Sequence, residues 1–377
     1  MKNRVAQVFN LQIAGRQVGN LRYVFALAVF CLAANWKIAE PGWGYEFPRD
    51  HHAHPEFKTE WWYFTGNLAA ADGRRFGYQL TFFRHGIRPP SARSAEISRF
   101  VVNDLKFAHF TITEIAGGQF HFQQKTSRGA FGEAGFDDGD RLAWIDSWTL
   151  QMEANGAFHL RADDHGNAID LRLVSRTPPI IHGEGGVSQK AAGAGHASYY
   201  YSLPRLTTEG ELQLGGKTMR VSGESWFDHE WATNQLAPDQ VGWDWLSVQF
   251  DDGSELMLYR MRLANGAVDP TSSGTWIAAD GTASHLPNSA FQMTPLSFWK
   301  SEKTGAKYPI AWRVDITPMN LHFEVRAALE NQELALLPLA YWEGAITIEG
   351  TRAGKPTKGR GYLELTGYAG PLQELQR

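Results

Sequence analysis

The sequence is poor in cysteine and has little excess charge of either sign. Cys31 is the single cysteine among 377 residues. One thiol excludes a disulfide framework and a cluster of thiolate metal ligands. The chain has 36 Lys+Arg against 40 Asp+Glu, a net charge of -4, and no dense basic run, which argues against nucleic acid as a partner.

Signatures of several enzyme classes are also missing. The sequence has no Gly-x-Ser-x-Gly elbow, which disfavours a serine esterase. Gly183-Glu184-Gly185 lacks the strand-turn-helix context of a nucleotide fingerprint. No stretch holds helical periodicity for more than a few turns, so an α-helical protein is not expected.

Aromatic residues are abundant, with 14 Trp, 12 Tyr and 22 Phe. Such side chains favour strands and line pockets for apolar ligands. The alternative is that they fill the interior of large β-barrels. The composition, with 43% hydrophobic and 20% charged residues, is that of a globular protein, and its length favours two domains.

The N-terminus has the pattern of an export signal. Residues 1–22 contain basic residues and no acid, and residues 23–34 are uncharged. A basic lead before a short apolar run predicts a signal peptide or N-terminal anchor over residues 1–40. We therefore expect a periplasmic or secreted protein that contacts the membrane only through this segment. The alternative is a buried N-terminal helix.

Alternating apolar residues and tight turns predict an all-β chain. Phe76, Tyr78, Leu80 and Phe82 alternate with other residues, which is typical of a half-buried strand. Turn pairs recur at Asp72-Gly73, Asp138-Gly139, Asn155-Gly156, Gly166-Asn167, Asp252-Gly253, Asn265-Gly266 and Asp280-Gly281. Such pairs favour β-hairpins. A polar, proline-containing stretch after residue 233 suggests two domains, 41–234 and 235–377.

The central candidate site is the sequence Trp-Phe-Asp-His-Glu-Trp at residues 226–231. In an extended strand, the even-numbered residues, Asp228 among them, would lie on one face and the odd-numbered ones on the other. A carboxylate between indoles loses water, which raises its pKa and suits it to proton transfer near neutral pH. A structural carboxylate bound to backbone amides is the alternative.

Three other polar stretches carry weaker signals of function. Asp50-His51-His52-Ala53-His54 contains three histidines without the spacing of a metal site, so we expect a polar loop and neither metal nor cofactor. Residues 183–195 are rich in Gly and Ala, which predicts a flexible loop. Asp244 is expected to form structural salt bridges with Arg260 and Arg262.

Five motifs carry a resemblance that covers most of the chain after residue 45. They are Glu60-Trp61-Trp62-Tyr63, Tyr200-Tyr201-Ser202-Leu203-Pro204-Arg205-Leu206, Trp226-Phe227-Asp228-His229-Glu230-Trp231, Gly242-Trp243-Asp244-Trp245 and Gly361-Tyr362-Leu363-Glu364-Leu365-Thr366-Gly367-Tyr368. With these motifs the chain resembles the AttH and carotenoid 1,2-hydratase superfamily of lipocalin-like proteins.

The resemblance implies two lipocalin-like antiparallel β-barrel domains packed together, with an apolar cavity. The better-understood members protonate polyene or terpenoid substrates and add water, and related fungal proteins fold polyenes for cycloaddition. The chain continues Glu230-Trp231 after the Trp-x-Asp-His core, which is similar to the branch called secreted hydrolases. Other members are found beside lipoprotein-export-type transporters.

Two functions are therefore expected as alternatives. The first is acid–base hydration or hydrolysis of a hydrophobic molecule, of isoprenoid, polyene or lipid type. Its catalytic candidates are Asp228, His229, Tyr201 and Glu60, and its substrate-binding candidates are Trp226, Trp231, Tyr199, Trp243, Trp245 and Trp62. The second is non-catalytic binding of a hydrophobic ligand, in partnership with an ABC transporter of the envelope. A purely structural envelope protein is a third, weaker alternative.

Overall fold

The computed structural model describes residues 35–93, 98, 100–336 and 340–370. The leader predicted at residues 1–40 lies almost wholly outside the described residues. Among the described residues, no helix has the length and apolar character needed to cross a membrane.

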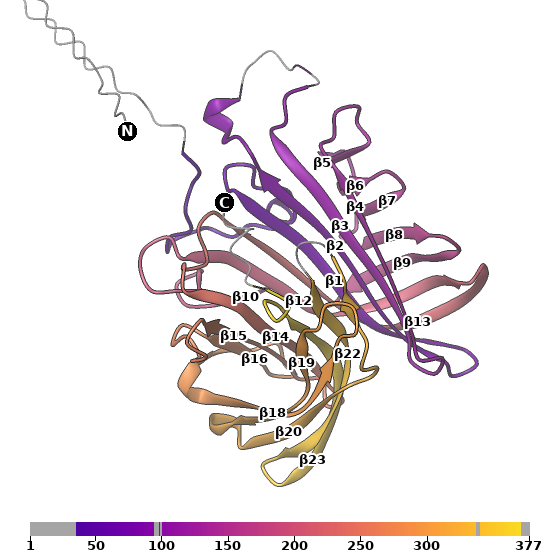
Figure 1. The fold of residues 1–377 in the computed structure, drawn as a ribbon, viewed down its shortest axis with the longest axis vertical. Coiled ribbons are helices and arrows are strands. Elements are labelled where there is room, and N and C mark those ends of the chain that lie inside the picture. The colour runs from indigo at the N-terminus through magenta and orange to yellow at the C-terminus, as the bar shows by residue number, and fades with distance from the viewer. Residues whose placement is uncertain (1–34, 94–97, 99, 337–339, 371–377) are drawn as a thin grey trace, which may run out of the picture. The chain divides into compact units, whose positions relative to one another are not determined.

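Strands dominate the described chain and form two antiparallel sheets (Figure 1). The first sheet consists of β1 (Thr59–Ala70), β2 (Arg75–Gly86), β3 (Asp104–Glu114), β4 (Gln119–Ser127), β5 (Ala134–Asp138), β6 (Arg141–Ile145), β7 (Trp148–Met152), β8 (Phe158–Asp164), β9 (Asn167–Ser175), β10 (Ile180–Ile181), β11 (Ser188–Gln189), β12 (Ala197–Leu214) and β13 (Lys217–Ala232).

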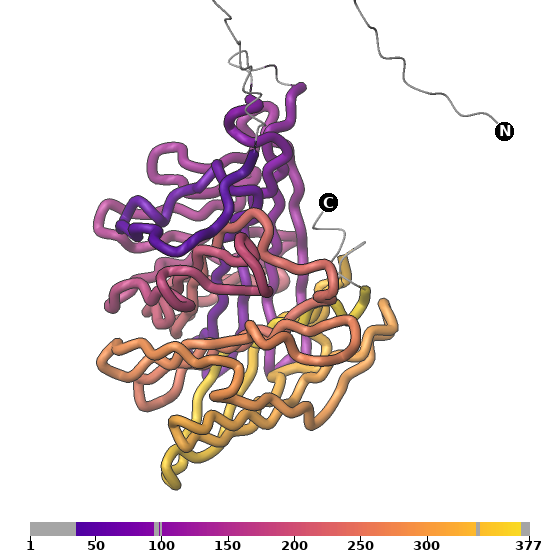
Figure 2. Tube along the Cα trace, turned by 90° about the vertical axis from the view of Figure 1, so that its left-hand side faces the viewer, coloured from indigo at the N-terminus to yellow at the C-terminus, as the bar shows by residue number. Residues whose placement is uncertain are grey.

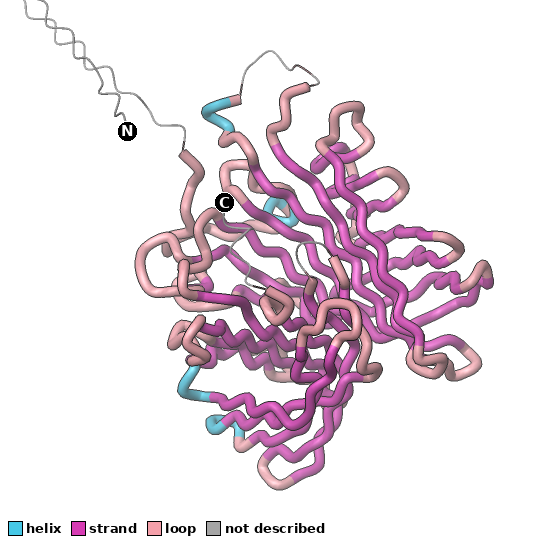
Figure 3. Tube along the Cα trace, viewed as in Figure 1, coloured by secondary structure: helices cyan, strands magenta, loops and turns pink. Residues whose placement is uncertain are grey.

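The second sheet follows in the chain, as the colour change in Figure 2 shows. It consists of β14 (Gln240–Phe250), β15 (Glu255–Leu263), β16 (Ser273–Ile277), β17 (Ala283–Pro287), β18 (Phe291–Lys300), β19 (Lys307–Ile316), β20 (Leu321–Ala327), β21 (Glu333–Leu334), β22 (Tyr341–Arg352) and β23 (Lys355–Leu365). The helices of the described residues are short 3₁₀ turns (Figure 3), namely η1 (Arg49–His51), η2 (Pro90–Ala92), η3 (Asn288–Ala290) and η4 (Thr317–Met319).

The predicted turns lie between consecutive antiparallel strands. The glycines of all seven turn pairs have positive φ, for example +84° at Gly73 between β1 and β2 and +86° at Gly253 between β14 and β15. Glycine adopts this conformation at little cost, so each pair lets the chain reverse. These turns explain why neighbours in sequence become neighbours in the sheet.

The all-β prediction is confirmed, and the two sheets form one nearly closed barrel and one half-barrel. The chain changes from the first sheet to the second in the loop 233–239, between β13 and β14. The assignment of residues 41–234 and 235–377 to separate domains stays a prediction.

Three apolar clusters form the core. One lies within the first sheet, one within the second, and a third joins side chains of both, including Tyr63 and Trp226 from the first and Trp245 from the second. The sheets approach closely there, because a Cβ at Gly77 would lie 2.7 Å from the Tyr362 hydroxyl. Asn67 also donates a hydrogen bond to a backbone carbonyl of β23. This contact between the sheets positions the candidate site.

Candidate functional site

Strand β13 separates the predicted site residues into two groups. It lies between β1 and β12 in the first sheet, with Asp228 paired to Tyr63 on one side and to Ser202 on the other. Trp226 and Asp228 face the second sheet, whereas His229 and Trp231 face the interior of the first. The predicted division of the two faces is confirmed.

Asp228 is buried where the two sheets meet, with 3% of its surface exposed. Its Oδ2 accepts a hydrogen bond from the Tyr200 hydroxyl at 2.7 Å, and its Oδ1 accepts bonds from Trp226 Nε1 at 2.5 Å and from the Ser202 hydroxyl. Burial raises the pKa of Asp228 to about 7, because these three donors only partly offset it and Glu230 adds to it.

A second layer of side chains holds the donors in place. Trp245 Nε1 donates to the Tyr200 hydroxyl at 3.0 Å. His182 Nε2 lies 2.6 Å from the Ser202 hydroxyl, and its Nδ1 lies 2.8 Å from the Thr275 hydroxyl on β16. Burial holds the pKa of His182 well below its usual value, so this ring stays neutral. The second sheet thus orients both hydroxyls that contact Asp228.

Two further carboxyl groups face Asp228 from the second sheet. Glu343 and Glu364 are cross-strand partners on β22 and β23, and Trp245 pairs with Glu364. Burial raises the pKa of Glu364 to about 8. A hydrogen bond with the Trp243 side chain opposes this rise, and the Asp228 charge adds to it. Burial and the neighbouring Glu364 hold the pKa of Glu343 well above its usual range.

Tyr63 lies among these three carboxyl groups. Burial, followed by the charges on Glu343 and Glu364, raises its pKa well above the usual value, and Asp228 adds to the effect. A hydrogen-bond interaction with Glu343 also raises the pKa of Tyr63 and lowers that of Glu343, so the hydroxyl of Tyr63 lies beside the Glu343 carboxyl group.

The other catalytic candidates lie on the opposite face of the first sheet. The Tyr201 hydroxyl is 2.7 Å from His51 Nδ1 and 3.2 Å from His229 Nδ1. His229 Nε2 is 3.0 Å from Glu60 Oε1. Tyr201 and His229 therefore do not lie on the face that carries Asp228, because alternate residues of β12 and β13 point to opposite faces, and their catalytic roles stay predictions.

Glu60, the remaining catalytic candidate, is held as an anion, and its catalytic role stays a prediction. Burial alone would raise its pKa, but the Arg84 guanidinium and the hydrogen bonds of His229 and His54 hold the pKa of Glu60 well below its usual range. Arg84 Nε lies 3.0 Å from Glu60 Oε2, and both side chains are buried. A carboxylate held this way has little tendency to accept a proton near neutral pH.

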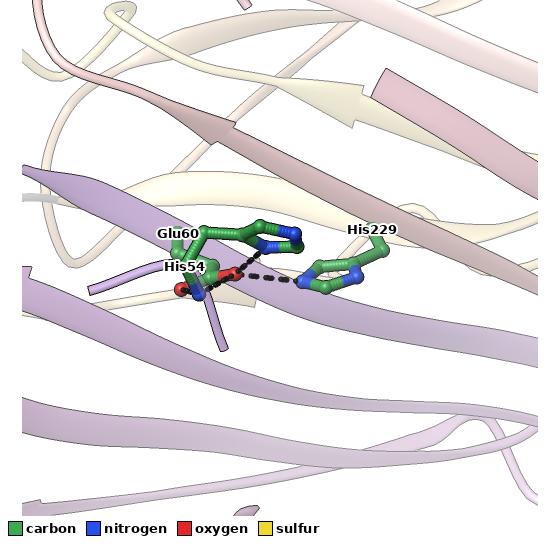
Figure 4. Close-up of side chains that lie close together, drawn as sticks. All are labelled: His54, Glu60 and His229. Carbon is green, nitrogen blue, oxygen red and sulfur yellow. Dashed lines mark hydrogen bonds and ion pairs between the residues drawn. The ribbon is translucent and has the colours of Figure 1, made fainter. Parts of the chain in front are cut away.

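In the histidine-rich segment, Asp50, His51 and His54 are buried, whereas His52 is partly exposed. His54 Nδ1 lies 2.8 Å from Glu60 Oε1, and its ring stacks on Trp231 with a centroid distance of 3.8 Å. Figure 4 shows His54 and His229 directed at the same Glu60 oxygen. One nitrogen of each imidazole and this oxygen lie within 4.8 Å of one another, so this set could hold a metal ion.

The six aromatic candidates are divided in the same way. Trp226, Trp243 and Trp245 belong to the cluster between the sheets, near Asp228. Trp62, Tyr199 and Trp231 belong to the core of the first sheet. The first three therefore lie on the same side of the first sheet as Asp228, and the other three do not.

Sequence reasoning missed several polar residues of the site. The catalytic candidate on β12 is Tyr201. Its neighbours Tyr200 and Ser202 point to the opposite face of that strand, and Ser202 pairs with Asp228. Glu343 and Glu364 stand in apolar strands, and an acid in that setting is the signal that could have identified them.

Two structural expectations had different outcomes. The salt bridges of Asp244 are confirmed, with Arg260 Nη2 at 2.6 Å and Arg262 Nε at 3.3 Å. The flexibility expected of residues 183–195 stays a prediction, and Lys190 of this segment is buried with its Nζ 3.2 Å from Glu230 Oε1.

Two hollows lie away from Asp228. One of about 560 Å³ is lined by residues of the segment 43–56, including Asp50 and His54. Another of about 300 Å³ lies between strands of both sheets and is bordered by Phe122 and Glu333. The apolar cavity that the resemblance implies stays a prediction.

Known proteins with the same fold include a hydratase and a candidate AttH protein. The structure is similar to a candidate AttH protein of Nitrosomonas europaea, with a TM-score of 0.78, 34% identity, and coverage of 88% of this chain and 99% of that one. It is also similar in fold to kievitone hydratase of Nectria haematococca, with a TM-score of 0.68, 15% identity, and coverage of 88% and 96%.

The sequence is also similar to a known dehydratase and matches a family model. The dehydratase asqC of Emericella nidulans is 26% identical over 211 residues, which are 52% of this chain and 57% of the relative. The chain therefore spans little more than half the length of that relative. The AttH-like family model matches residues 38–368. This protein belongs to the AttH-like family.

Proposed function

We propose that this protein is an exported enzyme that adds water to a carbon–carbon double bond of a hydrophobic molecule, or removes water in the reverse direction. The observation that carries the proposal is the Asp228 carboxyl group, which is buried between aromatic rings and contacted by three hydrogen-bond donors. Its raised pKa keeps a large fraction of the group protonated near neutral pH.

In the hydration direction, protonated Asp228 gives its proton to one carbon of the double bond. The resulting cation is stabilised by the ring faces of Trp226, Trp243 and Trp245. Water forms a bond to the cationic carbon and loses one proton, which returns to Asp228 through its hydroxyl neighbours Tyr200 and Ser202. The sum is the addition of one water molecule, without oxidation or reduction.

The relatives support this reaction class. Kievitone hydratase shares the fold, and the curated relative is called a dehydratase, so both names describe the gain or loss of water. The position of Asp228 between aromatic side chains favours a substrate of isoprenoid or polyene type over a polar one. Export rests on the basic and apolar N-terminal pattern of the sequence.

The test uses the purified protein and a panel of prenylated, terpenoid and polyene alkenes in ¹⁸O-labelled water. Mass spectrometry should detect one compound class that gains one labelled water with the wild-type protein. The Asp228→Asn variant should lose this activity, whereas Asp170→Asn, at an exposed aspartate on β9, should keep it. Equal binding of a hydrophobe by wild type and Asp228→Asn, without turnover by either, would instead support a carrier.

A further inference from the structure

His54, Glu60 and His229 form a buried cluster behind the face that carries Asp228. His54 follows η1, Glu60 lies on β1 and His229 lies on β13, so three segments meet at one point (Figure 4). The exposed fractions are 6%, 1% and 0%. Nδ1 of His54, Oε1 of Glu60 and Nε2 of His229 all lie within 4.8 Å of one another.

Each imidazole in this cluster has an oxygen atom beside both ring nitrogens. His229 Nδ1 lies 2.9 Å from the Asp50 carbonyl oxygen, and its Nε2 lies 3.0 Å from Glu60 Oε1. His54 Nε2 lies 3.3 Å from the Asp50 carboxylate, and its Nδ1 lies 2.8 Å from the same Glu60 oxygen. These Asp50 and Glu60 oxygens belong to a backbone carbonyl or a carboxylate, so they accept hydrogen bonds and cannot donate them. Each ring nitrogen beside such an oxygen must therefore carry a proton or share a cation with it.

A neutral imidazole has one N–H, so it can satisfy only one of its two oxygen neighbours. Without a bound cation, both rings must therefore carry two protons to avoid contacts between lone pairs. That would place two imidazolium groups and the Arg84 guanidinium around two buried carboxylates, Glu60 and Asp50. A divalent cation in place of the two inner protons keeps the total charge the same and satisfies all three inner atoms.

The outer contacts of the cluster are those expected around a metal ion. Metal-bound histidines usually donate their other N–H to a carboxylate or a backbone carbonyl. Asp50 provides both, its carboxylate to His54 and its carbonyl to His229. The backbone N–H of His54 donates to both Glu60 oxygens, at 3.0 Å from Oε1 and 2.9 Å from Oε2, whereas Arg84 Nε donates to Oε2, so Oε1 is the oxygen that faces both imidazoles.

We propose that His54 Nδ1, Glu60 Oε1 and His229 Nε2 bind one divalent transition-metal ion, with Zn²⁺ the best match to the ligands. Two histidines and one glutamate are a known zinc ligand set that leaves a fourth position for water. Ligands at ordinary zinc distances stand about 3.3 Å apart, so the two nitrogen–oxygen pairs, at 2.8 and 3.0 Å, need to separate by only a few tenths of an ångström.

The site has an access route and a structural consequence. The hollow of about 560 Å³ is lined by both Asp50 and His54, so an ion can reach the cluster from solvent. The bound ion would fasten the segment after η1 to β1 and β13. This inference does not depend on the role of Asp228, which lies on the other face of β13.

The first test is made on the wild-type protein, purified without a histidine tag or chelator from zinc-supplemented cells. We expect about one equivalent of zinc per chain by plasma mass spectrometry. After removal of zinc with dipicolinate, titration with Zn²⁺ should restore one site, and Co²⁺ should give the visible spectrum of a low-coordinate site. A protein that contains no zinc and shows no saturable binding of either ion would overturn the proposal.

The second test assigns the ligands. Glu60→Gln and His229→Asn should each weaken Zn²⁺ binding at least 100-fold, and Asp50→Asn should weaken it about 10- to 100-fold through the histidine that it orients. His109→Asn is the matched control, because His109 is a buried histidine that contacts Tyr341, outside the cluster, and its loss should leave the affinity unchanged. If folded Glu60→Gln keeps the wild-type affinity, the proposal is wrong. If the ligand variants do not fold, X-ray absorption of the wild-type zinc complex decides, and a spectrum without imidazole ligands would overturn it.

Discussion

The Tyr200 hydroxyl donates a hydrogen bond to Asp228 Oδ2 at 2.7 Å and accepts one from Trp245 Nε1 at 3.0 Å. A residue of the second sheet thereby orients the donor that contacts the carboxyl group of the first. Loss of the Trp245 side chain should therefore affect chemistry at Asp228. No side chain of the second sheet hydrogen-bonds to Asp228 itself in the described structure. The proposed site belongs to both sheets.

Asp228→Asn should lower the turnover number about 10²- to 10⁴-fold, the range that general acid catalysis contributes. Asparagine has a similar shape and still accepts hydrogen bonds, but it cannot transfer the proton. Ligand affinity, measured by quenching of tryptophan fluorescence, should change little. A variant that retains wild-type turnover would contradict the role of Asp228 as the acid.

The rate of hydration should fall as the pH rises through about 7. The reaction needs protonated Asp228, and the carboxyl group, whose pKa is raised to about 7, loses its proton across that range. The reverse reaction starts from the same protonated form, because the mechanism returns the proton to Asp228 and consumes no net proton, so kcat/KM for dehydration should fall over the same pH range. Measurement of kcat/KM from pH 5 to 9 in both directions checks this, and a hydration rate that increases above pH 7 would contradict it.

Some of this arrangement follows from local sequence, and some does not. The alternation of β13 predicted which side chains share a face with Asp228, and the Asp244–Arg260 pair was predictable because β14 and β15 form one hairpin. The contact of Glu364 with the Asp228 site depends on packing between two sheets, which no local pattern specifies. The position of His54 beside Glu60 and His229 likewise depends on the path of a loop without regular structure.

Glu364→Gln should stabilise the protein at high pH. Burial raises the pKa of Glu364 from an ordinary value of 4.5 to about 8, so the folded state holds a proton that the unfolded state has already released between these values. Wild-type stability should therefore fall as the pH rises through this window, by at most about 1.4 kcal/mol per pH unit from this group.

Glutamine removes this penalty, so the difference in unfolding free energy between variant and wild type should be near zero at pH 4.5 and largest above pH 8. Urea unfolding at several pH values measures it. Glu349→Gln, on the exposed end of β22, is the control and should show no such increase with pH. A difference for Glu364→Gln that does not grow with pH would show that the carboxyl group is solvated.

Lys190→Met should destabilise the protein because it leaves Glu230 without its cation. Both side chains are buried, Lys190 Nζ lies 3.2 Å from Glu230 Oε1, and the ammonium also lies 4.0 Å from the Tyr259 ring centre. Removal of one partner of a buried ion pair costs about 3–5 kcal/mol. Lys358→Met, in the exposed pair with Glu349, should change the free energy of unfolding very little.

The double variant Lys190→Met/Glu230→Gln separates the two causes of this loss. If the cost of Lys190→Met comes from the unpaired Glu230 charge, neutralising that residue should recover most of the lost stability. If the cost comes from packing of the lysine stem against Tyr200 and Tyr259, the double variant should remain as unstable as the single one. Urea unfolding of the wild type and three variants at pH 7 gives the coupling energy directly. A coupling energy near zero would mean that Lys190 fixes its loop by packing and that its charge contributes nothing to the fold.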